Sequence, residues 1–462
     1  MSSEPVNTVY GPLPPNLNFS DLDHLCLEGG VQTGPFGSQL HQEDYVIDGT
    51  PIITVEHLGE NRITHSNLPR ISDKDKARLS KYSLKTGDIV FSRVGSVDRR
   101  ALVQPAEDGW LFSGRCLRVR PNPEVLDSRW LSYFFGLPAF KNYIRGIAVG
   151  ATMPSINTKI LSEVPIYFPE IQVQRQASTV LTYIDDRIAL LRETNATLES
   201  IAQALFKSWF VDFDPVNAKA EGREPEGISA EIARLFPSRF DASGLIPHGW
   251  SHTTLGQVCA RHGGSIQTGP FGSQLHASDY VDAGIPVIMP KDLANRRVTE
   301  QSTARIRQSD ADRLSRHKVR AGDIVFSRRG DVERHALIGN FEADWICGTG
   351  CLLVRPGSAW PSATFLSMAL DEQGARKWLV RHAVGATMPN LNTGILANVP
   401  LVMPETEILE AFENIIASTE EKRSANYESI QVLTALRDTL LPRLVFGQLR
   451  LPEAEAMLQD AA

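Results

Sequence analysis

The sequence predicts an α+β protein in which two similar mixed α/β domains, related by an approximate two-fold axis, are joined by two long helices that form an antiparallel coiled coil. Three observations predict it: an internal repeat, short β-rich runs within each copy, and a heptad stripe after the first copy. The length of 462 residues and the 42% hydrophobic content are sufficient for two or three cores. A charged fraction of 22% excludes a disordered or fibrous chain.

The internal repeat has a constant offset of 235 residues. It carries residues 32–40 (QTGPFGSQL) onto 267–275, 87–93 (GDIVFSR) onto 322–328, and 148–154 (AVGATMP) onto 383–389 without a change. Laying 31–169 over 266–404 needs no gap and gives 60 identities in 139 positions. The identities are uneven, since 133–147 shares none with 368–382. The chain is therefore two copies of one unit, whether the uneven spread reflects function or the random drift of a recent duplication.

Each copy is predicted to fold as a mixed α/β domain. Short β-rich runs bounded by Gly, Pro and Asp occur at 51–55, 88–92 and 116–120, with partners in the second copy, and helical spacing follows at 128–143 and 361–379. We expect domains at 1–169 and 250–404, a central long helix at 170–214, a linker at 215–249 with a short helix, a distal long helix at 405–450 and a tail at 451–462.

A heptad stripe predicts the coiled coil. Its first half contains Ala177, Leu181, Ile184, Ile188, Leu191, Asn195, Leu198, Ala202, Leu205 and Trp209. The second copy supplies Phe412, Ile416, Asn426, Ile430, Leu433, Leu440 and Leu444, although Thr419, Arg423 and Arg437 weaken that stripe. A buried amide at Asn195 would fix the register. The alternative is a long amphipathic helix packed on a globular domain.

The charge is divided unevenly along the chain. The formal total is −7, which at face value argues against nucleic acid. Residues 31–169 carry 17 basic and 14 acidic side chains and residues 266–404 carry 16 and 13, so each copy has a net charge of +3 and the remainder has −13. The two domains therefore have a modest tendency to bind phosphate. Duplex DNA is itself two-fold symmetric, so paired domains on rigid helices suit two half-sites at a fixed distance.

Candidate DNA contacts come from the loops that the repeat preserves. Glycines and hydroxyls in the first loop can approach a ligand, arginines at a loop tip suit guanine or phosphate, and Thr and Asn of the third loop can donate to either. The candidates are Thr33, Gly34, Ser38, Gln39, Arg93, Arg99, Arg100, Thr152 and Asn157, and Thr268, Gly269, Ser273, Gln274, Arg328, Arg329, Arg334, Thr387 and Asn392. The alternatives are a tight turn with Phe36 buried, solvated surface arginines, and Asx or Ser/Thr turns.

Several kinds of site are absent from the sequence. There is no P-loop, Cys-x-x-Cys pair or His-Glu-x-x-His motif. The five cysteines are odd in number and widely spread, so we expect free thiols, with Cys347 and Cys351 as a buried pair, and a reducing cytoplasm. No apolar run is long enough for a membrane span. We expect no metal site and no catalytic residue in this chain.

Motifs at the ends of the long helices resemble a known family. Residues 206–215 (FKSWFVDFDP), Pro247-His-Gly-Trp250 and 436–444 (LRDTLLPRL) are similar to the specificity subunit of type I restriction–modification systems. The resemblance implies that each domain is a target-recognition domain reading half of a bipartite DNA site. It also implies that the paired helices set the spacing and dock two methyltransferase subunits. The expected coiled-coil and docking residues are Ile184, Ile188, Leu191, Asn195, Leu198, Leu205, Trp209, Ile430, Leu433, Leu440 and Leu444.

The same resemblance implies that catalysis and cofactors belong to partner subunits. The methyltransferases would bring S-adenosylmethionine and methylate adenine, and restriction/translocase subunits would use ATP and Mg²⁺, so this chain would bind no cofactor. Asp214-Pro-Val216 does not match the Asn/Asp-Pro-Pro-aromatic motif of an adenine methyltransferase.

This chain departs from the family because its two domains are close relatives. We therefore expect two similar half-sites in inverted orientation, made unequal by differences at Glu56/Lys291, His57/Asp292, Val94/Arg329, Ser96/Asp331 and Arg100/His335. A stand-alone two-headed DNA-binding regulator is the alternative function, and an enzyme with an unrecognised active site is a third.

Overall fold

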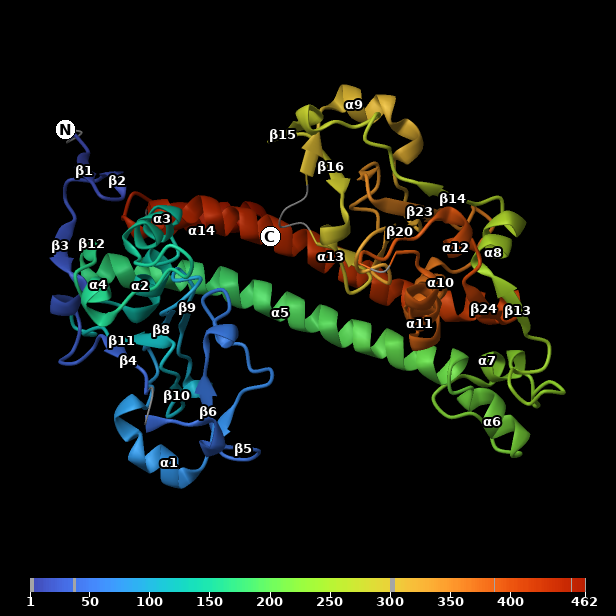
Figure 1. Cartoon of the computed structure of the whole chain (residues 1–462), viewed down its shortest axis with the longest axis horizontal. Coiled ribbons are helices and arrows are strands. Elements are labelled where there is room, and N and C mark those ends of the chain that lie inside the picture. The colour runs from blue at the N-terminus through green and yellow to red at the C-terminus, as the bar shows by residue number, and fades with distance from the viewer. Residues whose placement is uncertain (1–3, 36–38, 300–303, 386, 450, 462) are drawn as a thin grey trace. The chain divides into compact units, whose positions relative to one another are not determined.

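The chain forms two compact units, each of which combines one copy of the repeat with part of both long helices. The computed structural model describes residues 4–35, 39–299, 304–385, 387–449 and 451–461. One unit consists of residues 1–190 and 429–462, and the other of residues 191–428 (Figure 1). We call residues 31–169 head 1 and residues 266–404 head 2.

Two four-stranded sheets form the centre of head 1. The first is an antiparallel sheet of order β4-β11-β8-β9, from which the repeated loops extend. The second sheet has the order β10-β6-β7-β5. The strands of the first are β4 (Gln32–Thr33), β11 (Cys116–Val119), β8 (Ile89–Ser92) and β9 (Arg100–Leu102). Those of the second are β10 (Leu111–Phe112), β6 (Thr50–Ile53), β7 (Arg70–Ile71) and β5 (Tyr45–Val46).

Head 2 repeats this topology. Its antiparallel sheet has the order β14-β23-β20-β21 and its second sheet the order β15-β19-β16-β22. The strands of the first are β14 (Ser265–Thr268), β23 (Cys351–Arg355), β20 (Ile324–Ser327) and β21 (His335–Leu337). Those of the second are β15 (Tyr280–Val281), β19 (Ala304–Ile306), β16 (Ile285–Ile288) and β22 (Ile346–Cys347), and a small hairpin adds β17 (Leu293–Ala294) and β18 (Arg297–Val298).

Short helices and a closing strand pair complete each unit. The helices of the first are α1 (Asp73–Arg78), α2 (Ser128–Phe134), α3 (Pro138–Ile147) and α4 (Thr158–Ser162), and its further strands are β1 (Val6–Thr8), β2 (Gly11–Leu13), β3 (Asn18–Asp21) and β12 (Pro165–Phe168). The second has α8 (Leu255–Arg261), α9 (Gln308–Arg313), α10 (Ala363–Asp371), α11 (Gln373–His382) and α12 (Thr393–Ala397), with β13 (Ser251–Thr254) and β24 (Pro400–Met403). Each helix expected at 128–143 and 361–379 is thus two helices, and in head 1 the second starts at Pro138, which suits a first helical turn.

The repeated Gly-Asp pair starts the central strand of each head. Gly87 has φ 92°, a conformation that side chains disfavour, and the carboxylate of Asp88 accepts a hydrogen bond from the Lys85 backbone N–H across the turn. Both oxygens of Asp88 then accept from Arg120 at the end of β11, at 2.7 and 2.6 Å. Asp323 and Arg355 make the same bidentate pair in head 2, at 2.9 and 2.6 Å. The identity of this motif in the two copies therefore has a structural cause.

The long helices are α5 (Ile171–Phe210) and α13 (Thr406–Val445). In the first unit they run antiparallel: Asp185 of α5 contacts Arg437, while Val173, near the start of α5, lies beside Gly447, just after α13. Ala177, Leu181, Ile184, Ile188, Ile430, Leu433, Leu440 and Leu444 are buried in this unit. The indole N–H of Trp130 donates to the Val445 carbonyl at 3.0 Å, which joins α2 to the end of α13.

The second unit holds the other halves of the long helices, again antiparallel. Asn195 of α5 is 5% exposed and accepts a hydrogen bond from Asn426 of α13 at 2.8 Å. Toward the end of α5, Phe206 and Trp209 pack against Phe412, with ring centroids 6.2 and 6.0 Å apart. Leu191, Ala202 and Ile416 are buried, whereas Leu198 and Leu205 are half-buried.

The helix-end motifs form the aromatic core of the second unit. Phe210, which ends α5, packs against Trp250 and Phe412, with ring centroids 5.9 and 5.0 Å apart. The segment between the copies contains α6 (Asp214–Ala220) and α7 (Ala230–Leu235). Phe213, which precedes α6, has φ 55° and packs against Trp250 at 5.5 Å. These motifs thus join the long helix to head 2.

The expected fold class is confirmed, since mixed α/β sheets are combined with two long helices that pack together. A terminal helix, α14 (Leu451–Ala461), follows α13. Over the residues that the structure describes, no helix has both the length and the apolar content needed to cross a membrane.

The Asn195–Asn426 pair predicts a test by double-mutant cycle. Asn426→Leu leaves the buried Oδ1 of Asn195 without its donor, so we expect a loss of about 1–3 kcal/mol in the free energy of unfolding. Asn195→Leu combined with Asn426→Leu removes both polar groups and should recover most of that loss. Urea denaturation of the full chain measures both, and additive losses in the double variant would contradict the pairing.

Candidate nucleic-acid interface

The three repeated loop motifs meet at one end of the first sheet of head 1. The first loop leaves β4 after Thr33, and the Gly34 N–H donates to the carbonyl of Cys116, the first residue of β11. The second loop leaves β8 at Arg93, whose N–H donates to the carbonyl of Arg115 at 2.8 Å. Sequence spacing could not reveal this convergence, because it depends on strand order.

The third loop is tied directly to the second. The Gly95 N–H donates to the Pro154 carbonyl at 2.8 Å, and the Ile156 N–H donates to the Arg93 carbonyl at 2.9 Å. In head 2 the same bonds join Gly330 to Pro389 at 3.0 Å and Leu391 to Arg328 at 2.9 Å. Segments 93–99 and 149–157 therefore form one composite surface in head 1, and segments 328–334, 384–385 and 387–392 form its counterpart in head 2. We call this the loop surface of each head.

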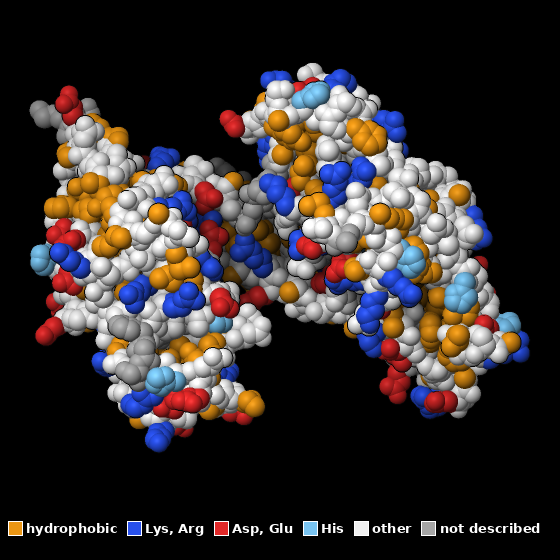
Figure 2. Space-filling model, viewed as in Figure 1, with side chains coloured by type: hydrophobic (Ala, Val, Ile, Leu, Met, Phe, Trp, Pro, Cys, Tyr) orange, Lys and Arg blue, Asp and Glu red, His pale blue; other side chains and the backbone are white. Residues whose placement is uncertain are grey.

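Most of the predicted contact residues of the three loops are at least partly accessible to solvent. Exposed side chains are those of Gln39, Arg99, Thr152, Asn157, Ser273, Arg329, Arg334, Thr387 and Asn392, and half-buried ones are those of Thr33, Arg93, Thr268, Gln274 and Arg328. Ser38 lies outside the described residues. On the face drawn in Figure 2, Lys and Arg side chains lie at many separate places on both heads, interspersed with acidic and neutral ones. This distribution agrees with a modest net charge on each head.

Arg100 differs from the expectation of an arginine at a loop tip. It is 6% exposed, and its Nε donates to the Ser132 carbonyl of α2 at 2.9 Å. Its counterpart, His335, is 2% exposed, and burial lowers the pKa of His335 to about 4, so the imidazole is neutral at pH 7. The prediction that Arg100 contacts DNA is wrong, because β9 starts at this residue and turns its side chain into the core.

Several other predicted residues have structural tasks in the loops. A Cβ at Gly34 would lie 2.2 Å from the Ser113 carbonyl oxygen, and one at Gly269 would lie 2.0 Å from that of Gly348. These glycines thus permit close approach to a neighbouring strand. The Oδ1 atoms of Asn157 and Asn392 each accept a backbone N–H at 2.8 Å and cap α4 and α12. The amide of Gln39 accepts the Tyr82 hydroxyl at 2.6 Å, and that of Gln274 accepts the Phe271 N–H.

The loop arginines are partly held by their own loops. Arg93 donates to the Gly114 carbonyl at 3.2 Å, and Arg99 donates to the Leu58 carbonyl. Arg334 pairs with Asp331 at 2.7 Å, but this pair is about half exposed and adds little stability. Arg329 is exposed at the tip of the second loop of head 2, where head 1 has Val94. Arg329 is therefore a charge that one head has and the other lacks.

Buried ion pairs attach each head to the long helices. In the second unit Glu199 of α5 contacts Arg423 of α13 and also Arg296 of head 2, the latter at 2.8 Å. Arg297 pairs with Glu420 of α13 at 2.6 Å. Arg423 and Arg296 are 3% and 6% exposed. Arg423, which looked like a weak point of the heptad stripe, is therefore the centre of the contact.

The first unit has a corresponding cluster with other residues. Asp185 of α5 accepts hydrogen bonds from Arg437 of α13 at 3.0 Å and from the Tyr133 hydroxyl of α2 at 2.7 Å. Arg437 also reaches Glu60 of head 1 at 3.4 Å. These carboxylates raise the pKa of Arg437 against the effect of burial. Both clusters were missed from the sequence. The available signal was an Arg at a heptad position of the distal helix, Arg423 or Arg437, together with acidic residues on the central helix that could pair with it.

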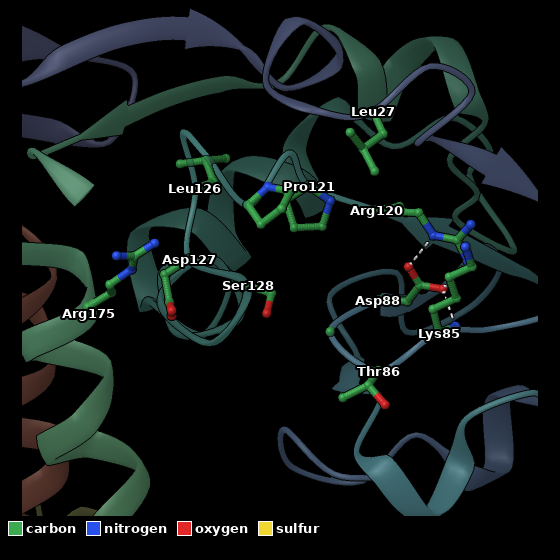
Figure 3. A pocket seen from close by; sticks show the side chains of 12 residues that line it. Leu27, Lys85, Thr86, Asp88, Arg120, Pro121, Leu126, Asp127, Ser128 and Arg175 are labelled. Carbon is green, nitrogen blue, oxygen red and sulfur yellow. Dashed lines mark hydrogen bonds and ion pairs between the residues drawn. The ribbon is translucent and has the colours of Figure 1, made fainter. Parts of the chain in front are cut away.

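A pocket lies at the opposite end of the first sheet of head 1 (Figure 3). Its lining includes Thr86, the Asp88–Arg120 pair, Ser128 and Arg175. The charged groups of Asp88 and Arg120 pair with one another at 2.6 Å, so we do not assign this pocket a ligand.

Thiols and acidic residues form no metal centre in the part of the chain that the structure describes. All five cysteines are free thiols, and Cys347 and Cys351 are fully buried. Burial raises the pKa of Cys347 to about 12, so this thiol stays protonated at neutral pH.

Comparisons with known proteins agree on one class. Residues 36–200 match the family described as type I restriction modification DNA specificity domain. Over 433 residues the chain is 28% identical to the type I restriction enzyme HindI specificity subunit of Haemophilus influenzae, covering 84% of this chain and 92% of that protein. It is 27% identical over 326 residues to the MjaIX specificity subunit of Methanocaldococcus jannaschii, covering 71% of this chain and 70% of that protein.

A solved structure shares the fold. The crystal structure of the type I restriction–modification S subunit from M. genitalium aligns with a TM-score of 0.56 at 16% identity, over 96% of this chain and 99% of that one. The fold and these relatives define a DNA-specificity protein. Residues 36–200 thus match the specificity domain, and most of the chain is similar to type I restriction enzyme specificity subunits, the non-catalytic component of such systems. These comparisons support the resemblance noted in the helix-end motifs.

The Arg437 cluster predicts a loss of stability on its removal. Arg437→Met leaves the mostly buried Asp185 without its cation, so we expect the free energy of unfolding to fall by about 3 kcal/mol. Arg443→Met, on an exposed position of the same helix, should change it by less than about 0.5 kcal/mol. Chemical denaturation of both variants checks this, and similar effects at the two positions would show that the cluster does not stabilise the unit.

Proposed function

We propose that this chain is the sequence-specific DNA-recognition subunit of a type I restriction–modification complex, with each head reading one half of a bipartite target. The observation that supports this most directly is the convergence of the repeated loops. Segments 93–99 and 149–157 form one surface in head 1, and segments 328–334, 384–385 and 387–392 form its counterpart in head 2. Exposed arginines and threonines on a rigid sheet end are suited to contact phosphates and base edges.

Residues on the loop surface have different assigned tasks. The arginines Arg93, Arg99, Arg328, Arg329 and Arg334 bind phosphate or guanine. Hydroxyl and amide contacts come from Thr33, Thr152, Thr268, Thr387, Gln39, Gln274, Ser38 and Ser273. The side-chain oxygens of Asn157 and Asn392 cap helices, so these two residues contact DNA through their amide N–H groups. Arg100 is excluded from this set.

The long helices set the spacing of the two half-sites and dock two methyltransferase subunits. Their inner faces are occupied within each unit by the buried stripe, the Asn195–Asn426 pair and the ion-pair clusters, so the docking surface consists of outer faces. The partner subunits carry S-adenosylmethionine, and restriction/translocase subunits with ATP and Mg²⁺ join that core in the cytoplasm. The predicted domains at 1–169 and 250–404 then serve as the two target-recognition domains.

Mapping adenine methylation in a host that carries the complete system tests this function. We expect a bipartite motif whose halves are similar and inverted, because the heads share 60 of 139 aligned residues and the same topology. Deleting this chain should abolish that methylation. Unrelated halves would contradict the inference from the repeat.

Purification of the tagged chain from the same host separates the alternatives. Recovery of methyltransferase subunits at two per chain supports the restriction–modification assignment. Tight, specific DNA binding by the chain without any methyltransferase would instead indicate a stand-alone regulator.

Arg329 predicts an asymmetry between the half-sites. Arg329→Ala should weaken binding of the assembled complex to its target and reduce the slope of log K against log salt concentration by about 0.9 if Arg329 contacts one phosphate. Arg261→Ala removes an exposed arginine near the other end of the same sheet, where β14 begins, and should leave that slope unchanged. Fluorescence anisotropy over a salt series measures both, and an unchanged slope for Arg329→Ala together with unchanged affinity would remove Arg329 from the interface.

A further inference from the structure

The third loop of each head presents apolar side chains to solvent. Val149 and Met153 are 62% and 57% exposed in head 1, and Val384 and Met388 are 64% and 61% exposed at the equivalent positions of head 2. Single exposed apolar residues are common on protein surfaces. A pair that occurs at the same two positions of both heads, at the tip of the same loop, needs a specific explanation.

The loop is a small, well-defined hairpin. Val149 and Ser155 exchange backbone hydrogen bonds at 2.9 and 2.8 Å, and Val384 and Asn390 do so at 2.9 Å in both directions. Gly150 has φ 109°, and a Cβ there would lie 2.7 Å from the Met153 carbonyl oxygen, so the tip requires glycine. The hairpin therefore holds Val149 and Met153 in positions where the described part of the unit leaves them exposed.

Packing does not account for the identity of the hairpin in the two heads. Residues 148–154 and 383–389 are identical, whereas the segments just before them, 133–147 and 368–382, share no residue even though both pack as helices. In the helices just before the hairpin the packed residues have thus been exchanged, whereas the exposed Val and Met of the hairpin have been kept. This is the opposite of what structural necessity alone produces.

The surroundings of the hairpin favour a polyanion as its partner. Arg145 precedes it at the end of α3, where it pairs with Asp98 at 2.5 Å, and the half-buried Arg93 is joined to it by the backbone bond from Ile156. In head 2 the exposed Arg381 precedes the hairpin, and Arg329 pairs through a β-bridge with Asn390. An apolar tip beside arginines suits duplex DNA, in which thymine methyl groups and the faces of base steps offer apolar contacts between two phosphate backbones.

We propose that the hairpin tips carrying Val149 and Met153 in head 1, and Val384 and Met388 in head 2, enter a groove of the target DNA. Met153 and Met388 make apolar contact there with thymine methyl groups and the faces of base steps, supported by Val149 and Val384. This rests on the proposed function. The flanking arginines give the salt-dependent attraction to phosphates, and the hairpin gives a salt-independent contact that orients each head on its half-site. The two heads make this contact in the same way, so sequence differences between half-sites come from other residues of the loop surface.

The test uses the full complex with its methyltransferase subunits and a duplex carrying the target mapped by methylation. Met153→Ala combined with Met388→Ala should weaken binding at least tenfold and leave the slope of log K against log salt concentration unchanged, because no charge is removed. Met153→Leu combined with Met388→Leu should retain most of the affinity. Leu245→Ala removes an apolar side chain that is 73% exposed outside both hairpins, and should have no effect.

Each outcome decides the proposal. Affinity within twofold of wild type for the alanine variant overturns the groove contact. Loss of methyltransferase subunits from the purified alanine variant also overturns it, since the hairpin would then bind protein. If the wild-type complex itself does not distinguish the mapped duplex from a scrambled one, the proposed function fails, whatever the hairpin variants do. Equal melting temperatures of the variants confirm that folding is unchanged.

Discussion

The attachment of each head to both long helices through buried charges is the constraint on which the arrangement of each unit depends. In the second unit a single carboxylate, Glu199, contacts Arg423 of α13 and Arg296 of head 2. In the first unit Asp185 contacts Arg437 and Tyr133. A buried ion pair is favourable only with good geometry, because desolvation of the charges opposes it. Apolar packing would tolerate small rotations of a head on the helices, whereas these contacts restrict them. The direction in which the loop surface of each head points is thereby fixed relative to its helices.

The two heads satisfy the same requirement with exchanged residues. At two repeat-equivalent positions head 1 has Asn61 and Arg100, and head 2 has Arg296 and His335. Asn61 and Arg100 both bond to Ser132, and His335 bonds to the equivalent Ser367. The buried guanidinium therefore belongs to the strand residue Arg100 in head 1 and to the turn residue Arg296 in head 2. The serine is present in both heads, as Ser132 and Ser367. This exchange explains why Arg100 and His335 differ although neither reaches the loop surface, and it removes them from the differences that distinguish the half-sites.

Much of the architecture could be predicted from the sequence, and the limits have physical reasons. The repeat and the heptad stripe depend on local periodicity, which is visible in the sequence, so both long helices and the paired domains were correctly predicted. The convergence of three loops depends on strand order, which no spacing encodes. The structural roles of Gly34, Asn157 and Arg100 were not predicted, because a small residue, a helix cap and a buried strand start look the same in sequence as ligand-binding groups. Arg423 and Arg437 were judged as defects in a stripe because their partners lie more than 200 positions away along the chain.

Identity between the two copies is informative only after the structural causes are removed. The Gly-Asp motif forms a turn and an internal ion pair, and the first glycine of the Thr-Gly-Pro-Phe loop permits two strands to approach. Once these are set aside, two shared features stay solvent-accessible in both heads: the loop arginines Arg99 and Arg334, and the apolar side chains of the third-loop hairpins. A duplicated chain preserves such features when both copies bind the same kind of surface. Duplex DNA is such a surface, because its phosphates can bind the arginines and its thymine methyl groups can contact the apolar hairpins. The acidic charge of the chain does not oppose this, because Asp185, Glu199 and Glu420 on the long helices face arginines within their own units.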